Sequence, residues 1–450
     1  MSEHRAADIA TTSAMYDFVQ ERESAARTYA NRFKLVFERA SGMRLYDLEG
    51  REYLDCLAAA GTLALGHNHP RIQGAVEEFL GSGALQQALD LTTPVKYHFL
   101  KRLYQCLPAR FAENARVQFC GPTGADAIEA ALKLFKTATK RNSIIAFHGA
   151  YHGMTSGSLA LTGNLTAKNF MGGLMPDVHF MPYPHPYRCP FGLGVEGYRA
   201  SLAYMEQVLS DPESGITLPA AVVVEVVQGE GGVIPAPIDW LRGLRRITAE
   251  AEVPLIIDEI QTGFGRTGEM FAFEAADIEP DAVVVSKALG GGYPLALMLY
   301  HKRYDAWTPG AHAGTFRGNQ IAMVAGTATM DILLEDELIK AVQEKGEYLA
   351  VRLAELADRY PRVGDVRGRG LMWGLEIVDP DGPLDMVGNP PPDGMAARAI
   401  QRECLANGLI LETGGRHGSV VRILPPLIIN PLELDEVVAR LDRALCAIHG

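Results

Sequence analysis

Lys287 and Asp258 each follow a short run of apolar, mostly β-branched residues. Lys287 stands after DAVVVS and before a glycine-rich stretch. Burial makes a lysine ammonium costly, so an amine in this position is readily deprotonated and can condense with an aldehyde. Asp258 ends the run VPLIID. A carboxylate that faces a pyridinium nitrogen keeps this nitrogen protonated and maintains an electron sink. Together the two residues indicate pyridoxal-phosphate (PLP) chemistry.

A phosphate group needs backbone N–H donors at the start of a helix. The segment CGPTGADAIEAALKLF offers them, because Thr123 can cap the helix and Gly124 and Ala125 are small enough for a phosphate to approach their N–H groups. Taken alone, this segment also fits an ordinary capped helix.

Two nucleotide-binding patterns compete with this interpretation. Apolar residues before Asp258–Glu259 are also typical of a Walker-B strand, but the chain contains no Gly-Lys dipeptide for a phosphate-binding loop. Gly192, Gly194 and Gly197 match G-x-G-x-x-G, yet they follow a proline-rich segment and not a strand. Both readings are therefore rejected.

His148 and His152 are spaced as a metal-binding pair on a helix would be. No third ligand and no H-E-x-x-H pattern accompanies them, so no metal is predicted. Tyr151, beside His152, could by itself be an interior tyrosine with a hydrogen-bonded hydroxyl. A G-x-S-x-G hydrolase motif does not occur.

The elements that must position these residues alternate along the middle of the chain. Short β-branched runs are separated by helical patterns, which is typical of parallel βαβ units. The runs are apolar throughout, as expected for strands covered by helices on both faces. We therefore predict an α/β fold with a doubly wound, mainly parallel sheet and ligand sites at the carboxyl ends of its strands. The strand candidates are ARVQFCG, RNSIIAFH, AAVVVEVV, PLIIDEI and DAVVVS.

Composition narrows the classes of protein and partner. A chain of 450 residues allows two or three domains, and 48% hydrophobic with 21% charged residues is ordinary for a globular enzyme. The net charge of −12 argues against nucleic acid or an anionic membrane as a partner. The six cysteines are scattered without C-x-x-C, and the N-terminal residues show no signal-peptide pattern, so we expect a cytoplasmic protein.

Several motifs resemble those of the class III aminotransferases, which are PLP-dependent enzymes of fold type I, and they occur in the order that this family shows. They are YHGMTSGSLALTGN, EVVQGEGGVIPAP, DEIQTGFGRTG, SKALGGGYPLA and GTFRGNQ. Within the class, three further segments are similar to those of diaminobutyrate–2-oxoglutarate transaminases: FCGPTGADAIEAALKLFKTAT, FMPYPHPYRCP and GGRHGSVVRILPPLII.

The resemblance implies roles around the cofactor ring. Lys287 would form the Schiff base with PLP and then carry the proton of the reaction as general base and acid. Asp258 would face the pyridine nitrogen, Tyr151 would stack on the ring, and Gln261 would bind its phenolic oxygen. His152 and Glu225 are also expected to contact the cofactor.

The same resemblance favours the phosphate interpretation of Thr123, Gly124 and Ala125, since this segment stands one strand before YHGM. Thr315 of GTFRGNQ resembles the residue that crosses a dimer interface and caps the neighbouring subunit's phosphate. A homodimer, or a dimer of dimers, is expected on that basis.

By likeness to relatives that act on ω-amino acids, Glu230 would pair with Arg422. The pair would mask the guanidinium while a diamine-type donor binds and release it when an α-keto acid arrives. Relatives that act on ornithine or 4-aminobutyrate carry an arginine after the HG of the YHG motif, whereas this chain has Met154. The small residues of 59–62 also replace bulkier polar groups, which makes these two donors less expected.

The resemblance thus implies reversible transfer of the terminal amine of L-2,4-diaminobutyrate to 2-oxoglutarate, with small-molecule donor and acceptor as the partners. Another ω-amino-acid aminotransferase or an aminomutase remains an alternative within the class. A non-catalytic PLP-fold binding or regulatory protein is the alternative outside it. The predicted domains are a large PLP-binding domain of residues 70–330 and a small α+β domain of residues 1–69 and 331–450.

Overall fold

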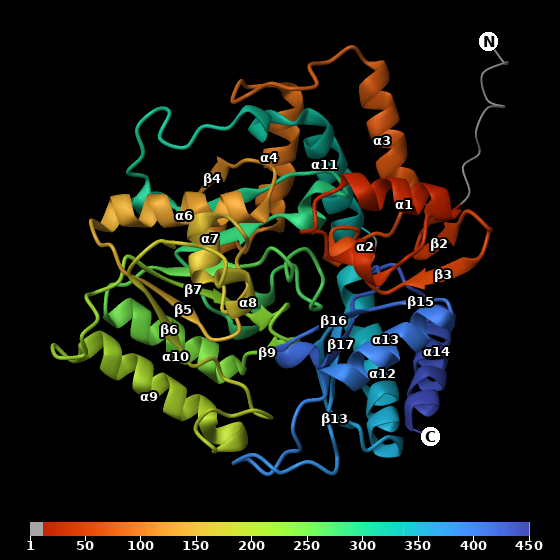
Figure 1. Cartoon of the computed structure of the whole chain (residues 1–450). Helices are drawn as coiled ribbons and strands as arrows, with labels where there is room; N and C mark the ends of the chain where they lie inside the picture. Colours follow the sequence, from red (N-terminus) through yellow and green to blue (C-terminus); the bar gives the residue numbers. More distant parts are fainter. Residues whose placement is uncertain (1–11, 336, 450) are drawn as a thin grey trace.

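The computed structural model describes residues 12–335 and 337–449 (Figure 1). A seven-stranded sheet with the order β4-β12-β11-β10-β7-β5-β6 lies in the larger part of the molecule. Its neighbours are parallel, except that β12 runs antiparallel to both β11 and β4. The strands are β4 Ala115–Phe119, β5 Ile144–Phe147, β6 Val178–Met181, β7 Ala221–Glu225, β10 Leu255–Asp258, β11 Ala282–Val285 and β12 Leu297–His301.

Helices cover both faces of this sheet, which explains why inner strands such as β10 are apolar up to their last residue. In β10, Leu255 and Ile257 pack in one hydrophobic cluster with side chains of α10 (Ile238–Glu250). Ile256 points the other way and packs with side chains of α6 (Gly124–Thr139). Side chains alternate across a strand, so a strand covered on both faces must be apolar at odd and even positions alike.

The remaining helices lie around this sheet or beside the smaller sheets described below (Figure 1). They are α1 Thr12–Arg22, α2 Tyr29–Arg32, α3 Pro70–Gly81, α4 Pro94–Cys106, α5 Ala109–Ala112, α7 Ser156–Leu161, α8 Leu165–Lys168, α9 Gly197–Ser210, α11 Gln320–Glu335, α12 Leu338–Arg359, α13 Gly394–Ala406 and α14 Pro431–His449. Short 3-10 turns are η1 Ala58–Gly61, η2 Gly194–Glu196, η3 Ala272–Ala276, η4 Lys287–Gly290, η5 Lys302–Tyr304, η6 Thr315–Gly318 and η7 Arg416–Gly418.

Two four-stranded sheets and one two-stranded sheet complete the fold. Their orders are β1-β2-β3-β15, β13-β14-β17-β16 and β8-β9. Their strands are β1 Phe37–Ser41, β2 Arg44–Asp47, β3 Glu52–Asp55, β8 Val227–Gln228, β9 Ile234–Pro235, β13 Val363–Arg369, β14 Met372–Ile377, β15 Leu409–Ile410, β16 Glu412–Gly414 and β17 Val420–Ile423.

The N-terminal and C-terminal parts of the chain meet in the first of these sheets. β2 and β3 form a hairpin, and β3 pairs in parallel with β15, with Leu54 opposite Leu409. The predicted domain boundary after residue 330 falls inside α11, which continues to Glu335. The division into residues 70–330 and the remainder stays a prediction.

No helix in residues 12–335 and 337–449 combines the length and the apolar character that crossing a bilayer requires.

Candidate active site

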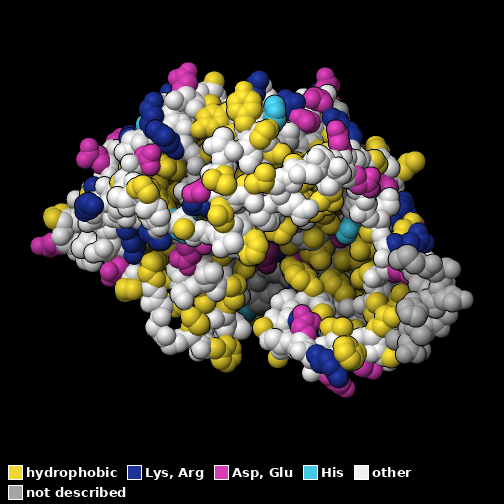
Figure 2. Space-filling model, turned by 90° about the horizontal axis from the view of Figure 1, so that it is seen from above, with side chains coloured by type: hydrophobic (Ala, Val, Ile, Leu, Met, Phe, Trp, Pro, Cys, Tyr) yellow, Lys and Arg dark blue, Asp and Glu magenta, His cyan; other side chains and the backbone are white. Residues whose placement is uncertain are grey.

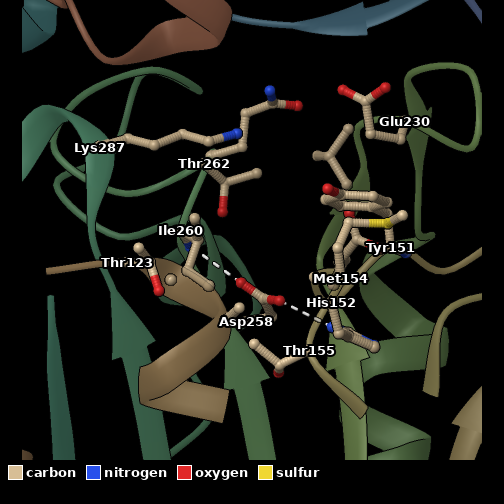
Figure 3. Close-up of a pocket in the computed structure, with 16 residues that line it drawn as sticks. Thr123, Tyr151, His152, Met154, Thr155, Glu230, Asp258, Ile260, Thr262 and Lys287 are labelled. Carbon is tan, nitrogen blue, oxygen red and sulfur yellow. Dashed lines mark hydrogen bonds and ion pairs between the residues drawn. The ribbon is translucent and has the colours of Figure 1, made fainter. Parts of the chain in front are cut away.

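A cavity of about 440 Å³ lies where β7 and β10 end and α6 begins (Figure 3). It gathers every predicted site residue except Thr315 and Arg422. Ligand sites of open α/β sheets lie at the carboxyl ends of the strands, so the cavity is in the expected place. Its lining residues are Thr123, Gly124, Ala125, Tyr151, His152, Gly153, Met154, Thr155, Glu225, Val227, Glu230, Asp258, Ile260, Gln261, Thr262 and Lys287.

Lys287 follows β11 and reaches into the cavity from the side opposite Tyr151 (Figure 3). Burial lowers the pKa of its amine, opposed by the carboxylate of Glu230 and reinforced by the guanidinium of Arg422. Its backbone lies in the left-handed region, with φ of +46°. A conformation of this kind costs a residue with a side chain on the order of 1 kcal/mol, and such strain is frequent at functional sites. The amine is thus held in the cavity, where burial destabilises its protonated form.

Asp258, the last residue of β10, lies at the base of the cavity and is 4% exposed. Its Oδ2 lies 2.7 Å from Nδ1 of the fully buried His152, and its Oδ1 accepts a hydrogen bond from the Ile260 N–H at 3.0 Å. Burial opposes protonation of His152, but the contact with Asp258 raises its pKa above the ordinary value. These two contacts fix the direction of the Asp258 carboxylate.

His148 and His152 do not share a site. His148 lines a different cavity, whereas His152 lines the one that contains Asp258. Although the two histidines are four residues apart in the sequence, their imidazoles therefore point into different cavities.

Glu225, the last residue of β7, holds two wall segments of the cavity together. Its Oε1 accepts a hydrogen bond from the Tyr151 N–H at 2.9 Å, and its Oε2 accepts one from the Gly229 N–H at 3.0 Å. Burial raises the pKa of this carboxyl to about 7. Glu225 thereby positions Tyr151, whose side chain lines the cavity on the side opposite Lys287 (Figure 3).

The helix α6 begins at the cavity with Gly124 and Ala125, and the first N–H groups of a helix have no acceptor within the helix. Thr123 is the N-cap, and its hydroxyl accepts a hydrogen bond from the Asp126 N–H. A Cβ atom at Gly124 would lie 2.7 Å from Cδ1 of Ile260, so a larger residue here would have to displace the Ile260 side chain. The arrangement is a built anion site at the positive end of a helix.

Arg422 is fully buried on β17 behind the cavity wall. Its Nη1 donates to Glu230 Oε1 at 2.6 Å and to Glu412 Oε2 at 3.3 Å, and its Nη2 donates to Gln261 Oε1 at 3.0 Å. Burial alone would raise the pKa of Glu230, but the charge of Arg422 holds this pKa below its ordinary value. The predicted pair of Glu230 and Arg422 is therefore present.

Sequence reasoning missed Glu412 and the residues around it. Glu412 lies directly opposite Arg422 in the pairing of β16 with β17. Its other oxygen, Oε1, lies 3.4 Å from Nη1 of Arg32, and Tyr29 stands beside it, with a phenol pKa raised by burial and by the Glu412 charge. No local motif marks these residues, since a cross-strand partner follows from register.

Gln261 also contacts an unusual turn. Its Nε2 donates to the Ala60 carbonyl at 3.1 Å. The residues Ala58, Ala59 and Ala60 have φ of +47°, +49° and +58°, all in the left-handed region that alanine disfavours by about 1 kcal/mol or more per residue. The small residues that the sequence singled out at 59–62 thus form a strained turn against the same glutamine that binds Arg422.

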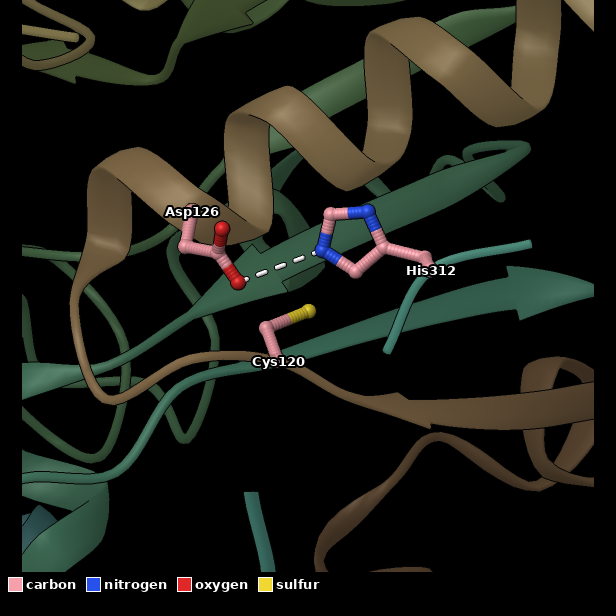
Figure 4. Close-up of side chains that lie close together, drawn as sticks. All are labelled: Cys120, Asp126 and His312. Atoms are coloured by element: carbon pink, nitrogen blue, oxygen red, sulfur yellow. Dashed lines mark hydrogen bonds and ion pairs between the residues drawn. The ribbon is translucent and has the colours of Figure 1, made fainter. Parts of the chain in front are cut away.

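Thr315 begins η6 and is exposed outside the cavity. The loop before it is tied to α6, because His312 Nε2 lies 3.2 Å from Asp126 Oδ2, beside Cys120 (Figure 4). Cys120, Asp126 and His312 offer ligand atoms within 4.8 Å of one another. Burial raises the pKa of the Cys120 thiol, which disfavours the thiolate that metals bind. The contact of Thr315 with a neighbouring subunit stays a prediction.

Comparison with known proteins gives consistent results. The family model "Aminotransferase class-III" matches residues 24–445. A "Diaminobutyrate--2-oxoglutarate aminotransferase" of Rhizobium meliloti is 53% identical, covering 95% of this chain and 91% of the relative. One of Haemophilus influenzae is 50% identical, covering 97% and 96%.

Solved structures share the fold. A PLP-bound amine transaminase from an uncultivated Pseudomonas species superimposes with a TM-score of 0.83 at 28% identity, covering 95% of this chain and 98% of that one. An ornithine aminotransferase from Toxoplasma gondii gives a TM-score of 0.82 at 23% identity, covering 98% and 96%, and at that identity the likeness speaks for the fold alone.

Proposed function

The chain belongs to the class III aminotransferases, which work with pyridoxal phosphate, and we propose that it transfers the terminal amine of L-2,4-diaminobutyrate to 2-oxoglutarate. The products are L-aspartate 4-semialdehyde and L-glutamate. Two relatives of 50% identity or more, each covered over more than nine-tenths of its length, carry the name of this reaction and support the substrate pair.

The cavity fits PLP at three separate places. The start of α6, with Thr123, Gly124 and Ala125, would hold the phosphate. Asp258 would face the pyridine nitrogen, and the amine of Lys287 would meet the aldehyde. When bound, PLP supplies a cationic ring that stabilises negative charge on the neighbouring substrate carbon. Tyr151 would cover one face of the ring and exclude water there.

Each protein group then has one task. Lys287 Nζ, whose pKa is lowered by burial, accepts the proton from the substrate carbon that bears the amine and later returns it. The contact with His152 keeps Asp258 aimed into the cavity, where its carboxylate would hold a proton on the group that it faces. Glu225 keeps Tyr151 in place through the Tyr151 backbone.

Glu230 and Arg422 would let one site accept two kinds of substrate. While Glu230 covers the guanidinium at 2.6 Å, a carboxylate of the donor finds no free cation there. When 2-oxoglutarate binds, its carboxylate takes the place of Glu230 in the bidentate geometry that arginine favours. Glu412 and Gln261 keep hold of Arg422 during the exchange, because they contact it independently of Glu230.

The observation that carries this proposal is the amine of Lys287 and the carboxylate of Asp258 facing one cavity that also contains a helix start. A panel of donors with 2-oxoglutarate tests it, with glutamate and the aldehyde product measured separately. Diaminobutyrate should give the highest kcat/KM, above ornithine and 4-aminobutyrate. A higher value with ornithine would contradict the donor assignment. Turnover of diaminobutyrate without a keto acid would indicate an aminomutase instead.

We propose that the protein is a homodimer, and that dimers can pair further. Thr315 lies outside its own cavity, and the loop of residues 83–93 lies beside η6, since the Ala88 N–H donates to the Gly318 carbonyl. The face seen from above, to which these segments belong, carries many hydrophobic side chains around a central hollow (Figure 2). Exposed apolar patches favour association. The large exposed apolar residues of these segments are Leu85, Leu89, Leu91 and Phe316.

We also propose a cytoplasmic location. All six cysteines are free, and five of them are buried. Free thiols persist in reducing compartments, where disulfides are rare.

A further inference from the structure

A second cavity of about 530 Å³, here called the back cavity, lies behind the wall of the active site. The two cavities share no lining residue, yet they share wall segments. Gly149 lines the back cavity, whereas Tyr151, two residues later, lines the active site. The loop that carries Arg416 is joined to the segment of Glu230, because the Gly415 N–H donates to the Glu230 carbonyl at 2.9 Å.

The lining of the back cavity is basic. Five of its residues can carry positive charge, and no aspartate or glutamate lines it in the part of the chain that the structure describes. The five are His148, Lys168, His185, Arg188 and Arg416. A concave site of one charge sign concentrates ions of the opposite sign.

The charges of Arg188 and Lys168 differ in how far they are compensated. Arg188 donates through Nε to Glu376 Oε1 and through Nη1 to Asp385 Oδ2, both at 2.8 Å. Lys168 donates from Nζ to the Ala160 carbonyl at 3.0 Å and lies over the ring of Phe180 at 4.4 Å, and no carboxylate of the described residues forms an ion pair with it. Phe180 also stacks beside His148.

Arg416 is the least compensated of the five. Within residues 12–335 and 337–449, its guanidinium has no hydrogen-bond or ion-pair partner, although surrounding protein lowers its pKa by desolvation. The nearest acid that acts on it, Glu376, is already engaged by Arg188 and by Arg367, whose Nη1 lies 2.8 Å from Glu376 Oε2. An arginine that is partly desolvated without a partner is costly, and an oxyanion would offset that cost.

We propose that the back cavity is a binding site for a small oxyanion, carboxylate or phosphate, held by Arg416 and Lys168. The guanidinium of Arg416 provides the paired donors that suit an oxyanion, and the Lys168 amine adds a second charge. Apolar lining suits the carbon skeleton of an organic anion, and here it is provided by Leu165, Phe180 and Tyr183. The site is separate from the reaction, and its existence does not depend on the substrates proposed above.

Isothermal titration of the PLP-loaded enzyme tests the site, with inorganic phosphate and succinate as probes in separate arms. The wild type should give saturable binding of at least one probe. Arg416→Gln should weaken that binding about tenfold or more. Arg402→Gln, an exposed arginine on α13 outside both cavities, is the matched control and should change it less than about twofold. Equal affinities for the wild type and Arg416→Gln would overturn the proposal, as would no saturable binding of either probe.

Histidine NMR places the probe within the molecule. Burial and the Arg416 charge both lower the pKa of His148, and burial with the charges of Arg367, Arg416 and Arg188 lowers that of His185. An oxyanion at Arg416 should raise both pKa values, whereas one at Arg422 in the active site should leave them unchanged. Saturable binding without movement of either histidine pKa would contradict the assignment to this cavity.

Discussion

The edge of the large sheet and the surroundings of Arg422 are built in opposite ways. Lys287, Asp258 and Glu225 follow or end adjacent strands of one sheet, and their positions are set by that sheet. Arg422 instead gathers partners from segments far apart in the sequence: Glu230, Gln261 and Glu412. The first region offers fixed chemistry, whereas the second offers a cation with exchangeable partners.

We infer that the strand ends serve proton transfer, whereas the surroundings of Arg422 serve substrate recognition. A proton must be moved at one position whichever substrate is bound, so the residues that move it belong on a rigid edge. A donor and an acceptor of different charge must be recognised in turn, which needs a partner that can leave. Glu230, with a side chain 33% exposed, can leave more easily than Glu412, with one 6% exposed.

Removing the amine of Lys287 at the carboxyl ends of the strands should have the largest effect on activity. Lys287→Ala should lower kcat for the diaminobutyrate reaction by about 10⁴-fold or more, because both the covalent step and the proton transfer lose their group. Steady-state assays of glutamate formation measure it. Lys302→Ala changes an exposed lysine outside the cavity and should leave kcat within about twofold. Retention of kcat in Lys287→Ala would contradict the role assigned to Lys287, whereas a wild type without turnover would favour the interpretation as a non-catalytic binding or regulatory protein.

Removing the charge at the base of the cavity should come next. Asp258→Asn should lower kcat about 10²-fold to 10⁴-fold, since a neutral amide does not hold a proton on the group opposite. The same change should lower the pKa of His152, because the contact with Asp258 is what raises it. NMR titration of His152 separates this effect from unfolding. An unchanged His152 pKa would show that the pairing at 2.7 Å is absent in solution.

Changes around Arg422 should affect the two substrates differently. Glu230→Gln should lower kcat/KM for diaminobutyrate about tenfold and change that for 2-oxoglutarate less than about threefold, because the exposed guanidinium then competes for the donor carboxylate. Glu412→Gln is the matched change on the other side of Arg422, and it should affect both substrates alike. Equal losses for the two substrates in Glu230→Gln would contradict the exchange.

The side chain next to Tyr151 gives a smaller test of specificity. Met154 is 56% exposed and lies at the cavity mouth beside Tyr151 (Figure 3). Met154→Arg adds a cation there and should raise kcat/KM for 4-aminobutyrate, which carries a distal carboxylate, several-fold. Met154→Gln controls for the added polarity. A similar gain with glutamine would show that charge is not the cause.

The smallest effect concerns stability and pH. Burial raises the pKa of Glu225 to about 7 from an ordinary value of 4.5, so the unfolded state binds fewer protons between these values. The free energy of unfolding should therefore fall as the pH rises from 4.5 to 7, by on the order of 1–3 kcal/mol for this group. Urea unfolding of Glu225→Gln should show a shallower fall over that window. An unchanged slope would show that Glu225 titrates normally.

The predictable part of the site is the rigid edge. Asp258 and Lys287 each end a recognisable apolar run, and the carboxyl ends of neighbouring parallel strands meet at one edge. The motif around Thr123 likewise marks a helix start. The mainly parallel sheet followed from the same runs, while the antiparallel placement of β12 did not, because its residues read like those of any buried strand.

The remainder depends on long-range register and on backbone shape. Glu412 meets Arg422 only because β16 pairs with β17 in one register. His152 meets Asp258 through a contact between residues 106 positions apart. The left-handed turn at Ala58–Ala60 has no signal either, since alanine is a residue from which a positive φ is not expected.

The account rests on the buried amine of Lys287 meeting the aldehyde of PLP in the cavity above Asp258. Borohydride reduction of the PLP-loaded enzyme fixes any such linkage, and peptide mass mapping then locates it. We predict one modified peptide, with the added mass on Lys287. An adduct on another lysine, or no adduct in protein that contains stoichiometric PLP, would contradict the account.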